Sequence, residues 1–126
     1  MNATHPNGNH LVGAEQLHGL LSTDEVCVFD CRFDLSTPDR GRELWLEAHI
    51  PGARYADLDP DLSSPPTDRS GRHPLPDPKD FAAFLARSGW TPGRGVVAYD
   101  DIGGALAARL WFLMRYFGQE GAAVLD

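Results

Sequence analysis

Basic residues are scarce in this sequence of 126 residues. Lys and Arg together number 11 against 18 Asp and Glu, so the formal net charge at pH 7 is −7. A protein that binds nucleic acid through its phosphates needs the opposite balance, and no basic run interrupts the acidic background. The charge therefore excludes nucleic acid as the expected partner.

Long apolar runs are also missing. No stretch approaches the roughly 18 apolar residues that a membrane-spanning helix needs. Residues 1–10 are polar and have neither the basic start nor the apolar stretch of a secretory signal. These features predict no membrane association, a cytoplasmic location and a flexible tail over residues 1–10.

Cysteine is limited to Cys27 and Cys31. If both lie on one strand, they are roughly 13 Å apart, whereas the Cα atoms of a disulfide lie within about 7 Å of each other. Two cysteines at this spacing are also too few for a zinc site, and the sequence implies neither a metal nor an organic cofactor. Apolar residues make up 42% of the chain, which is sufficient for one globular domain over residues 11–126.

Strand and helix patterns alternate along the whole of that domain. The expected strands are 11–12, 26–29, 54–55, 96–99 and 122–125, and the expected helices are 14–21, 38–48, 78–88 and 105–117. This order predicts an α/β open sandwich with a mainly parallel sheet flanked by helices. In the last helix, Arg109 is expected to reach solvent. The chain stops at a buried strand, so we expect a domain truncated at its C-terminus, with one sheet face short of a covering helix.

A glycine-bearing loop follows the expected strand 96–99. Its residues are Asp100, Asp101, Ile102, Gly103, Gly104 and Ala105. A tight loop between a strand and a helix can aim several backbone N–H groups at one anion, and it can equally be only a sharp turn. The spacing lacks the glycine pattern and the lysine of nucleotide-binding loops.

Several motifs together resemble one family. They are Phe29-Asp30-Cys31-Arg32-Phe33, His49-Ile50-Pro51-Gly52-Ala53 followed by Asp57-Leu58-Asp59, Gly71-Arg72-His73-Pro74-Leu75-Pro76, Val97-Ala98-Tyr99-Asp100, and Ala108-Arg109-Leu110-Trp111. In this order they resemble the first domain of the tandem-domain rhodaneses, the thiosulfate and 3-mercaptopyruvate sulfurtransferases. The resemblance runs from about Leu11 to Asp126.

The resemblance implies a silent domain. The active loop of the family reads C-x-x-G-x-R, whereas here Asp100 replaces the cysteine and Ala105 replaces the arginine. Sulfur transfer passes through a cysteine persulfide, which a carboxylate cannot form. The resemblance therefore implies that a second rhodanese domain in cis carries the reactive cysteine. The whole protein would move sulfane sulfur from a small-molecule donor, thiosulfate or 3-mercaptopyruvate, to a thiol or cyanide acceptor.

Two residues of this domain are implied to support the chemistry. In the mercaptopyruvate branch, an aspartate after the H-I-P-G-A motif and a histidine in the proline-rich loop form a proton relay with a serine of the second domain. Asp57 and His73 match those positions. A carboxylate that orients an imidazole is suited to general acid–base catalysis. The alternatives are that Asp57 caps a turn and that His73 is a solvated loop residue.

Two other functions are compatible with the sequence. The chain can be a non-catalytic rhodanese-like module that binds a partner or an anion, which a stop codon after residue 126 would favour. It can also be a thiol enzyme that uses Cys31, since this cysteine ends a strand beside Arg32. A buried packing role for Cys31 is the simpler interpretation.

Overall fold

A computed structural model describes residues 10–126 of the chain, and of the predicted tail only His10 falls within that range. Five parallel strands form one sheet in the order β1-β5-β4-β2-β3. The strands are β1 (Leu11–Val12), β2 (Val26–Asp30), β3 (Arg54–Tyr55), β4 (Gly95–Tyr99) and β5 (Ala122–Leu125). Together with the helices between them, the sheet confirms the predicted α/β fold.

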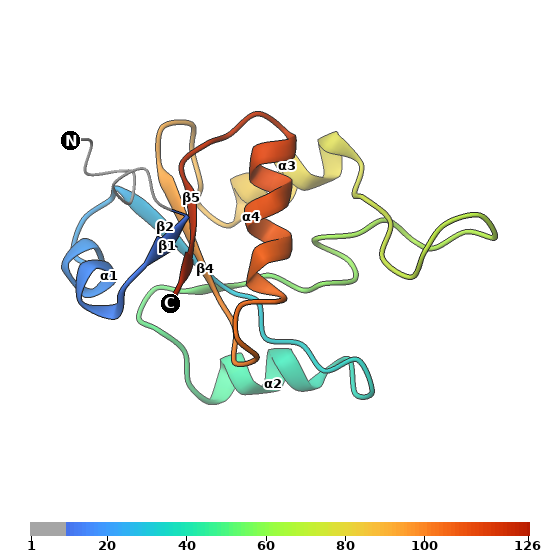
Figure 1. The fold of residues 1–126 in the computed structure, drawn as a ribbon, viewed down its shortest axis with the longest axis horizontal. Coiled ribbons are helices and arrows are strands. Elements are labelled where there is room, and N and C mark those ends of the chain that lie inside the picture. Colours follow the sequence, from blue (N-terminus) through green and yellow to red (C-terminus); the bar gives the residue numbers. More distant parts are fainter. Residues whose placement is uncertain (1–9) are drawn as a thin grey trace.

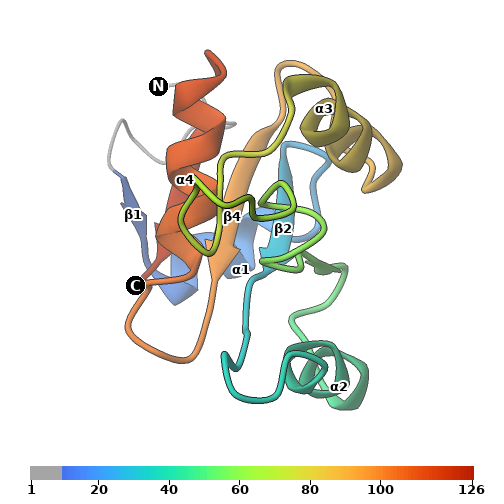
Figure 2. The same cartoon turned by 90° about the vertical axis from the view of Figure 1, so that its right-hand side faces the viewer.

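Helices cover both faces of the sheet (Figure 1). On one face lies α1 (Ala14–Leu20), and on the other lie α3 (Pro78–Arg87) and α4 (Ala107–Tyr116). The remaining helix, α2 (Arg40–Glu47), lies beyond the carboxyl ends of the strands (Figure 2). Within residues 10–126, each helix is too short or too polar to cross a bilayer.

The core consists of two layers separated by the sheet. Alternate residues of a strand point to opposite faces, so Phe29 packs with the α3 and α4 layer while Val28 packs with the α1 layer. The same alternation in β5 places Val124 in the first layer and Ala123 in the second. Both residues are buried and β5 lies between β1 and β4. The expectation that one face of the last strand would stay uncovered is therefore wrong.

Helix α3 begins where its N-cap signal predicts. The Asp77 carboxylate accepts a hydrogen bond from the Lys79 N–H at 2.8 Å, and Pro78 occupies the first helical position. The predicted start of α2 at residue 38 is two residues too early, because Thr37 belongs to a turn in which its carbonyl accepts from the Arg40 N–H.

Candidate functional site

Two loops meet at the carboxyl edge of the sheet, where ligands of open parallel sheets bind. Residues 100–106 connect β4 to α4, and residues 56–77 connect β3 to α3. Figure 2 shows both segments beside the ends of β2 and β4. The site residues expected for a sulfurtransferase domain lie in these two loops, whereas Cys31, the candidate of the thiol-enzyme alternative, directly follows β2.

The carboxylate of Asp100 lies at the centre of the first loop. Its Oδ1 accepts hydrogen bonds from the N–H groups of Ile102 at 3.0 Å and Gly104 at 2.8 Å. Its Oδ2 accepts from Leu106 at 2.8 Å and Ala107 at 2.7 Å. The last two bonds explain why α4 starts at Ala107, two residues after its predicted start. The loop is therefore an anion cradle whose anion is the side chain of its own first residue.

The electrostatics of Asp100 agree with this geometry. Burial acts to raise the pKa of the carboxyl, but the four hydrogen bonds from backbone N–H groups outweigh it and hold the pKa below its usual value. The chain wraps around the carboxylate at Gly103 and Gly104, which have φ angles of 79° and 95°. These left-handed conformations favour glycine. Asp101, Ile102 and Ala105 are exposed on the outside of the loop.

Asp57 organises the start of the second loop. Its Oδ1 accepts from the Asp59 N–H at 3.2 Å, and its own N–H donates to Asp61 Oδ2 at 2.9 Å. Its carbonyl accepts from the N–H groups of Asp61 and Leu62. Burial raises the pKa of the Asp57 carboxyl, and the nearby carboxylates of Asp61 and Asp59 act in the same direction. These are the contacts of a residue that caps a turn.

His73 faces a different aspartate from the one that the sequence indicated. Its Nδ1 lies 3.1 Å from Oδ1 of Asp59. The expected joint role of Asp57 and His73 stays a prediction. The Nδ1 atom is shielded from solvent. It lies within ion-pair distance of the Asp59 carboxylate, but the two groups are not aligned for a hydrogen bond. The sequence analysis named only Asp57 as the carboxylate, although Asp59 belongs to the same Asp-Leu-Asp motif.

Arg109 was expected to reach solvent, but its guanidinium turns toward the second loop. It donates to the carbonyls of Leu62, His73 and Pro74 at distances from 2.9 to 3.2 Å. Hydrophobic periodicity carries no signal for such a bond, because Arg109 occupies a position on α4 between the core and the surface. This residue links the helix behind the first loop to the base of the second.

Cys31 is buried beneath the first loop. Burial raises the pKa of its thiol well above the usual value, and the carboxylates of Asp30 and Asp100 raise it further. The neighbouring Arg32 is no activator, because its guanidinium is bound to both carboxylate oxygens of Asp30. A thiol held protonated in this way is a poor nucleophile.

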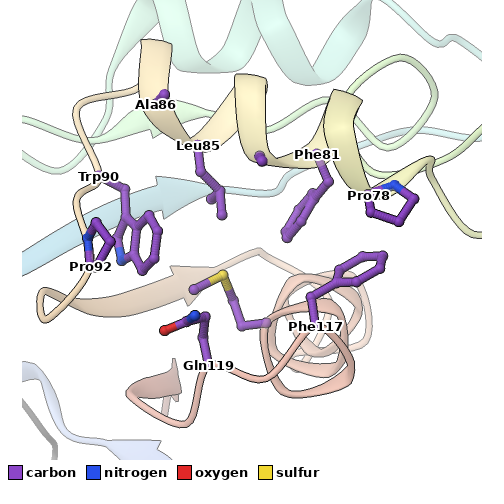
Figure 3. Close-up of a pocket in the computed structure, with 10 residues that line it drawn as sticks. Pro78, Phe81, Leu85, Ala86, Trp90, Pro92, Phe117 and Gln119 are labelled. Atoms are coloured by element: carbon purple, nitrogen blue, oxygen red, sulfur yellow. The ribbon is translucent and has the colours of Figure 1, made fainter.

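Among the hollows on the described surface, two differ clearly in character. One, of about 720 Å³, adjoins the first loop and has exposed Leu35 and Ile102 at its rim; Phe33, Leu44 and Leu106 also line it. The other, of about 350 Å³, is apolar and lies between α3 and α4 (Figure 3). Its lining includes Trp90 and Gln119, which precede β4 and β5. It therefore lies near the amino ends of the strands, away from the two loops.

The fold and the loop define a class: an α/β domain with a tight glycine loop after a central parallel strand and an aspartate at the start of that loop. The family model for the rhodanese-like domain matches residues 13–126. The chain belongs to this family.

Known proteins similar to this chain are sulfurtransferases by name. The "Probable 3-mercaptopyruvate sulfurtransferase" of Pseudomonas aeruginosa is 46% identical over 118 residues, which are 92% of this chain and 42% of that protein. The thiosulfate/3-mercaptopyruvate sulfurtransferase 2 of Arabidopsis thaliana is 34% identical over 117 residues, 92% of this chain and 33% of that protein. The structure of the 3-mercaptopyruvate sulfurtransferase from Leishmania major superposes with a TM-score of 0.85 at 31% identity, covering 97% of this chain and 33% of that one. This chain thus spans less than half the length of each.

Proposed function

We propose that this chain is the non-nucleophilic domain of a sulfurtransferase whose second domain, in cis, supplies the reactive cysteine. The observation that carries the proposal is the Asp100 carboxylate, which occupies the position of the family's cysteine and uses the N–H groups of the loop itself. The partial coverage of the relatives supports a longer protein. A cytoplasmic location stays a prediction from the sequence.

The proposed reaction has two forms that differ in their protons. With thiosulfate, the cysteine thiolate of the second domain attacks the outer sulfur, an S–S bond forms, the S–S bond of thiosulfate breaks and sulfite leaves. With 3-mercaptopyruvate, the thiolate attacks the thiol sulfur, the C–S bond breaks and the departing carbon keeps the electron pair. That carbon then takes a proton and the thiol loses one, so only this donor requires a proton to be moved.

We assign the movement of that proton to His73, with Asp59 as the carboxylate beside it. The two groups are 3.1 Å apart, and the His73 side chain retains 26% of its exposure. An imidazole next to a carboxylate is suited to accept and return a proton near neutral pH. In this assignment Asp57 has no chemical part and shapes the turn that presents Asp59.

The hollow beside the first loop is the surface that we assign to the second domain. Leu35 and Ile102 expose 65% and 55% of their surface at its rim, and exposed apolar groups gathered in one place indicate a contact surface. A domain docked there brings its cysteine to the same sheet edge as His73. Thiosulfate or mercaptopyruvate would then bind between the domains, and a thiol or cyanide would accept the sulfur.

A direct test compares this chain with the protein extended through the sequence that follows residue 126. We expect the 126-residue chain to produce no thiocyanate from thiosulfate and cyanide, no pyruvate from mercaptopyruvate, and no mass increase of one sulfur atom. The extended protein should do all three. Turnover by the short chain that Cys31→Ser abolishes would replace our proposal with a thiol enzyme.

The non-catalytic binding module receives less support from the structure. A module that binds small anions needs free N–H groups in the loop, and Asp100 already occupies three of them together with the first N–H group of α4. A stop codon directly after residue 126 in the gene, together with inactivity of the chain, would favour the module over the enzyme.

A further inference from the structure

The guanidinium of Arg109 crosses the base of the second loop. Nε and Nη2 donate to the Leu62 carbonyl at 3.2 and 3.0 Å, on the outgoing arm of the loop, which leads away from β3. Nη2 also donates to the carbonyls of His73 at 2.9 Å and Pro74 at 3.1 Å, on the returning arm, which leads to α3. One side chain thus holds two segments that lie more than ten residues apart in the sequence.

The same base has one backbone hydrogen bond between its arms, from the Ser64 N–H to the Pro74 carbonyl at 3.0 Å. Beyond this bond, residues 65–72 project away from the sheet (Figure 1). Leu62 anchors the outgoing arm, because its side chain is buried in the core. The returning arm has no comparable anchor at His73, whose side chain faces Asp59.

The hydrogen bonds from Arg109 to the two arms of the loop, which we call the clamp, require a guanidinium. Within residues 10–126 no carboxylate lies at ion-pair distance from Arg109, so its attachment consists of neutral acceptors. The Arg109 side chain is partly buried, and this burial lowers the pKa of its guanidinium. A planar fork with several donors can bond to two arms at once, whereas an ammonium is a compact point charge on a flexible stem.

We infer that Arg109 is a positioning residue that sets His73 against Asp59 by bonding to the His73 carbonyl and to the opposite arm of the loop. The importance of this pair for sulfur transfer rests on the proposed function, whereas the clamp itself does not. Arg109 projects from the first turns of α4, which the Asp100 carboxylate fixes through the Leu106 and Ala107 N–H groups. The first loop, silent in the covalent step, thereby supports the geometry of the second.

The test uses the 126-residue chain and NMR spectroscopy. We compare the wild type with Arg109→Gln and Arg109→Lys, and follow the nuclear Overhauser effect between the His73 ring and the Asp59 side chain together with exchange of the Ser64 amide hydrogen. In Arg109→Gln the Overhauser effect should disappear and exchange at Ser64 should accelerate about tenfold or more. Arg109→Lys should show a smaller change in the same direction. The buried amide of Val97 should keep its chemical shift in both variants, which a general loss of structure would not allow.

Arg115→Gln is the matched control, because Arg115 lies on the same helix and contacts the Trp111 ring instead of the loop. It should leave both signals unchanged. Wild-type signals in Arg109→Gln, full restoration by lysine, or the same losses in Arg115→Gln would each overturn the inference. If the loop loosens in Arg109→Gln but the extended protein keeps its mercaptopyruvate turnover, the clamp stands and the proposed role of His73 fails.

Discussion

The two loops at the carboxyl edge of the sheet use their polar groups in opposite ways. In residues 100–106 the Asp100 carboxylate accepts from three backbone N–H groups of its own loop and from that of Ala107, the first residue of α4. In residues 56–77 the His73 Nδ1 is shielded from solvent, close to Asp59, and without an aligned hydrogen bond. The N–H groups of the first loop bind its own carboxylate, whereas the second loop holds an imidazole close to a carboxylate without an aligned hydrogen bond between them.

This difference assigns a structural role to the first loop and a chemical role to the second, although both lie at the same edge of the sheet. The His73 imidazole lies 3.1 Å from the Asp59 carboxylate and is not fixed by an aligned hydrogen bond, so it can still exchange a proton with a substrate. A carboxylate with four donors stabilises its own surroundings and has little left to offer a substrate. The comparison therefore predicts effects on turnover in the second loop and effects on stability in the first.

The largest expected effect is that of His73→Ala in the extended protein. If His73 moves the proton in the mercaptopyruvate reaction, turnover with this donor should fall about 100-fold or more. Turnover with thiosulfate should fall far less, because that reaction releases sulfite without a proton transfer. Steady-state kinetics with both donors and the same acceptor measure, for each donor, the ratio of wild-type to variant turnover.

Arg72→Ala is the control for this variant, since Arg72 is the exposed neighbour of His73. It should change neither ratio and should alter the free energy of unfolding by less than about 0.5 kcal/mol. Equal losses with both donors in His73→Ala would indicate a role in binding or folding. The claim that the second loop takes part in the chemistry would then fail.

The sequence was sufficient for the fold because local signals and the hydrophobic pattern agreed. The apolar run at 26–29 and the cap at Asp77 each predicted an element whose observed bounds, Val26–Asp30 and Pro78–Arg87, differ by a residue or less. The motif order gave the family as well. Prediction was weaker where a side chain acts on distant backbone, as in the start of α4, because no periodic pattern encodes such a bond.

The second expected effect concerns the stability of the first loop. Asp100→Ala removes the acceptor of four N–H groups, and water can replace it only in part because the Asp100 side chain is partly buried. We expect the free energy of unfolding at pH 7 to fall by about 2 kcal/mol. Urea denaturation measures this loss, and Asp101→Ala, at the exposed neighbouring position, should cost less than about 0.5 kcal/mol.

The pH dependence of that loss tests its electrostatic origin. The pKa of Asp100 is lower in the folded chain than in the unfolded chain, so its stabilisation is present above the unfolded value of about 3.9. It is lost as the pH falls through the folded value. The stability difference between the wild type and Asp100→Asn should therefore shrink below about pH 4. A difference that stays constant down to pH 2.5 would show that shape, and not charge, holds the loop.

The candidate site shows where sequence reasoning stops. The motifs led to His73 and to Asp57, but the carboxylate beside His73 is Asp59, and its position depends on the course of a long, proline-rich loop. Arg109 was hidden for a related reason: its partners are backbone carbonyls, which every residue has. Contacts of this kind depend on tertiary placement, and the sequence alone does not specify it.

The smallest expected effect is at Cys31, which lies between the two regions at the end of β2. Its thiol is buried, and the carboxylates of Asp30 and Asp100 further disfavour its thiolate. In a Cys27→Ala background, alkylation of Cys31 by iodoacetamide at pH 7 should be at least about ten times slower than in the urea-unfolded chain. Cys31→Ala should leave the kinetics of the extended protein unchanged with either donor. Labelling as fast in the folded chain as in urea would mean that the first loop opens readily, and Asp100 would then no longer qualify as the group that keeps it closed.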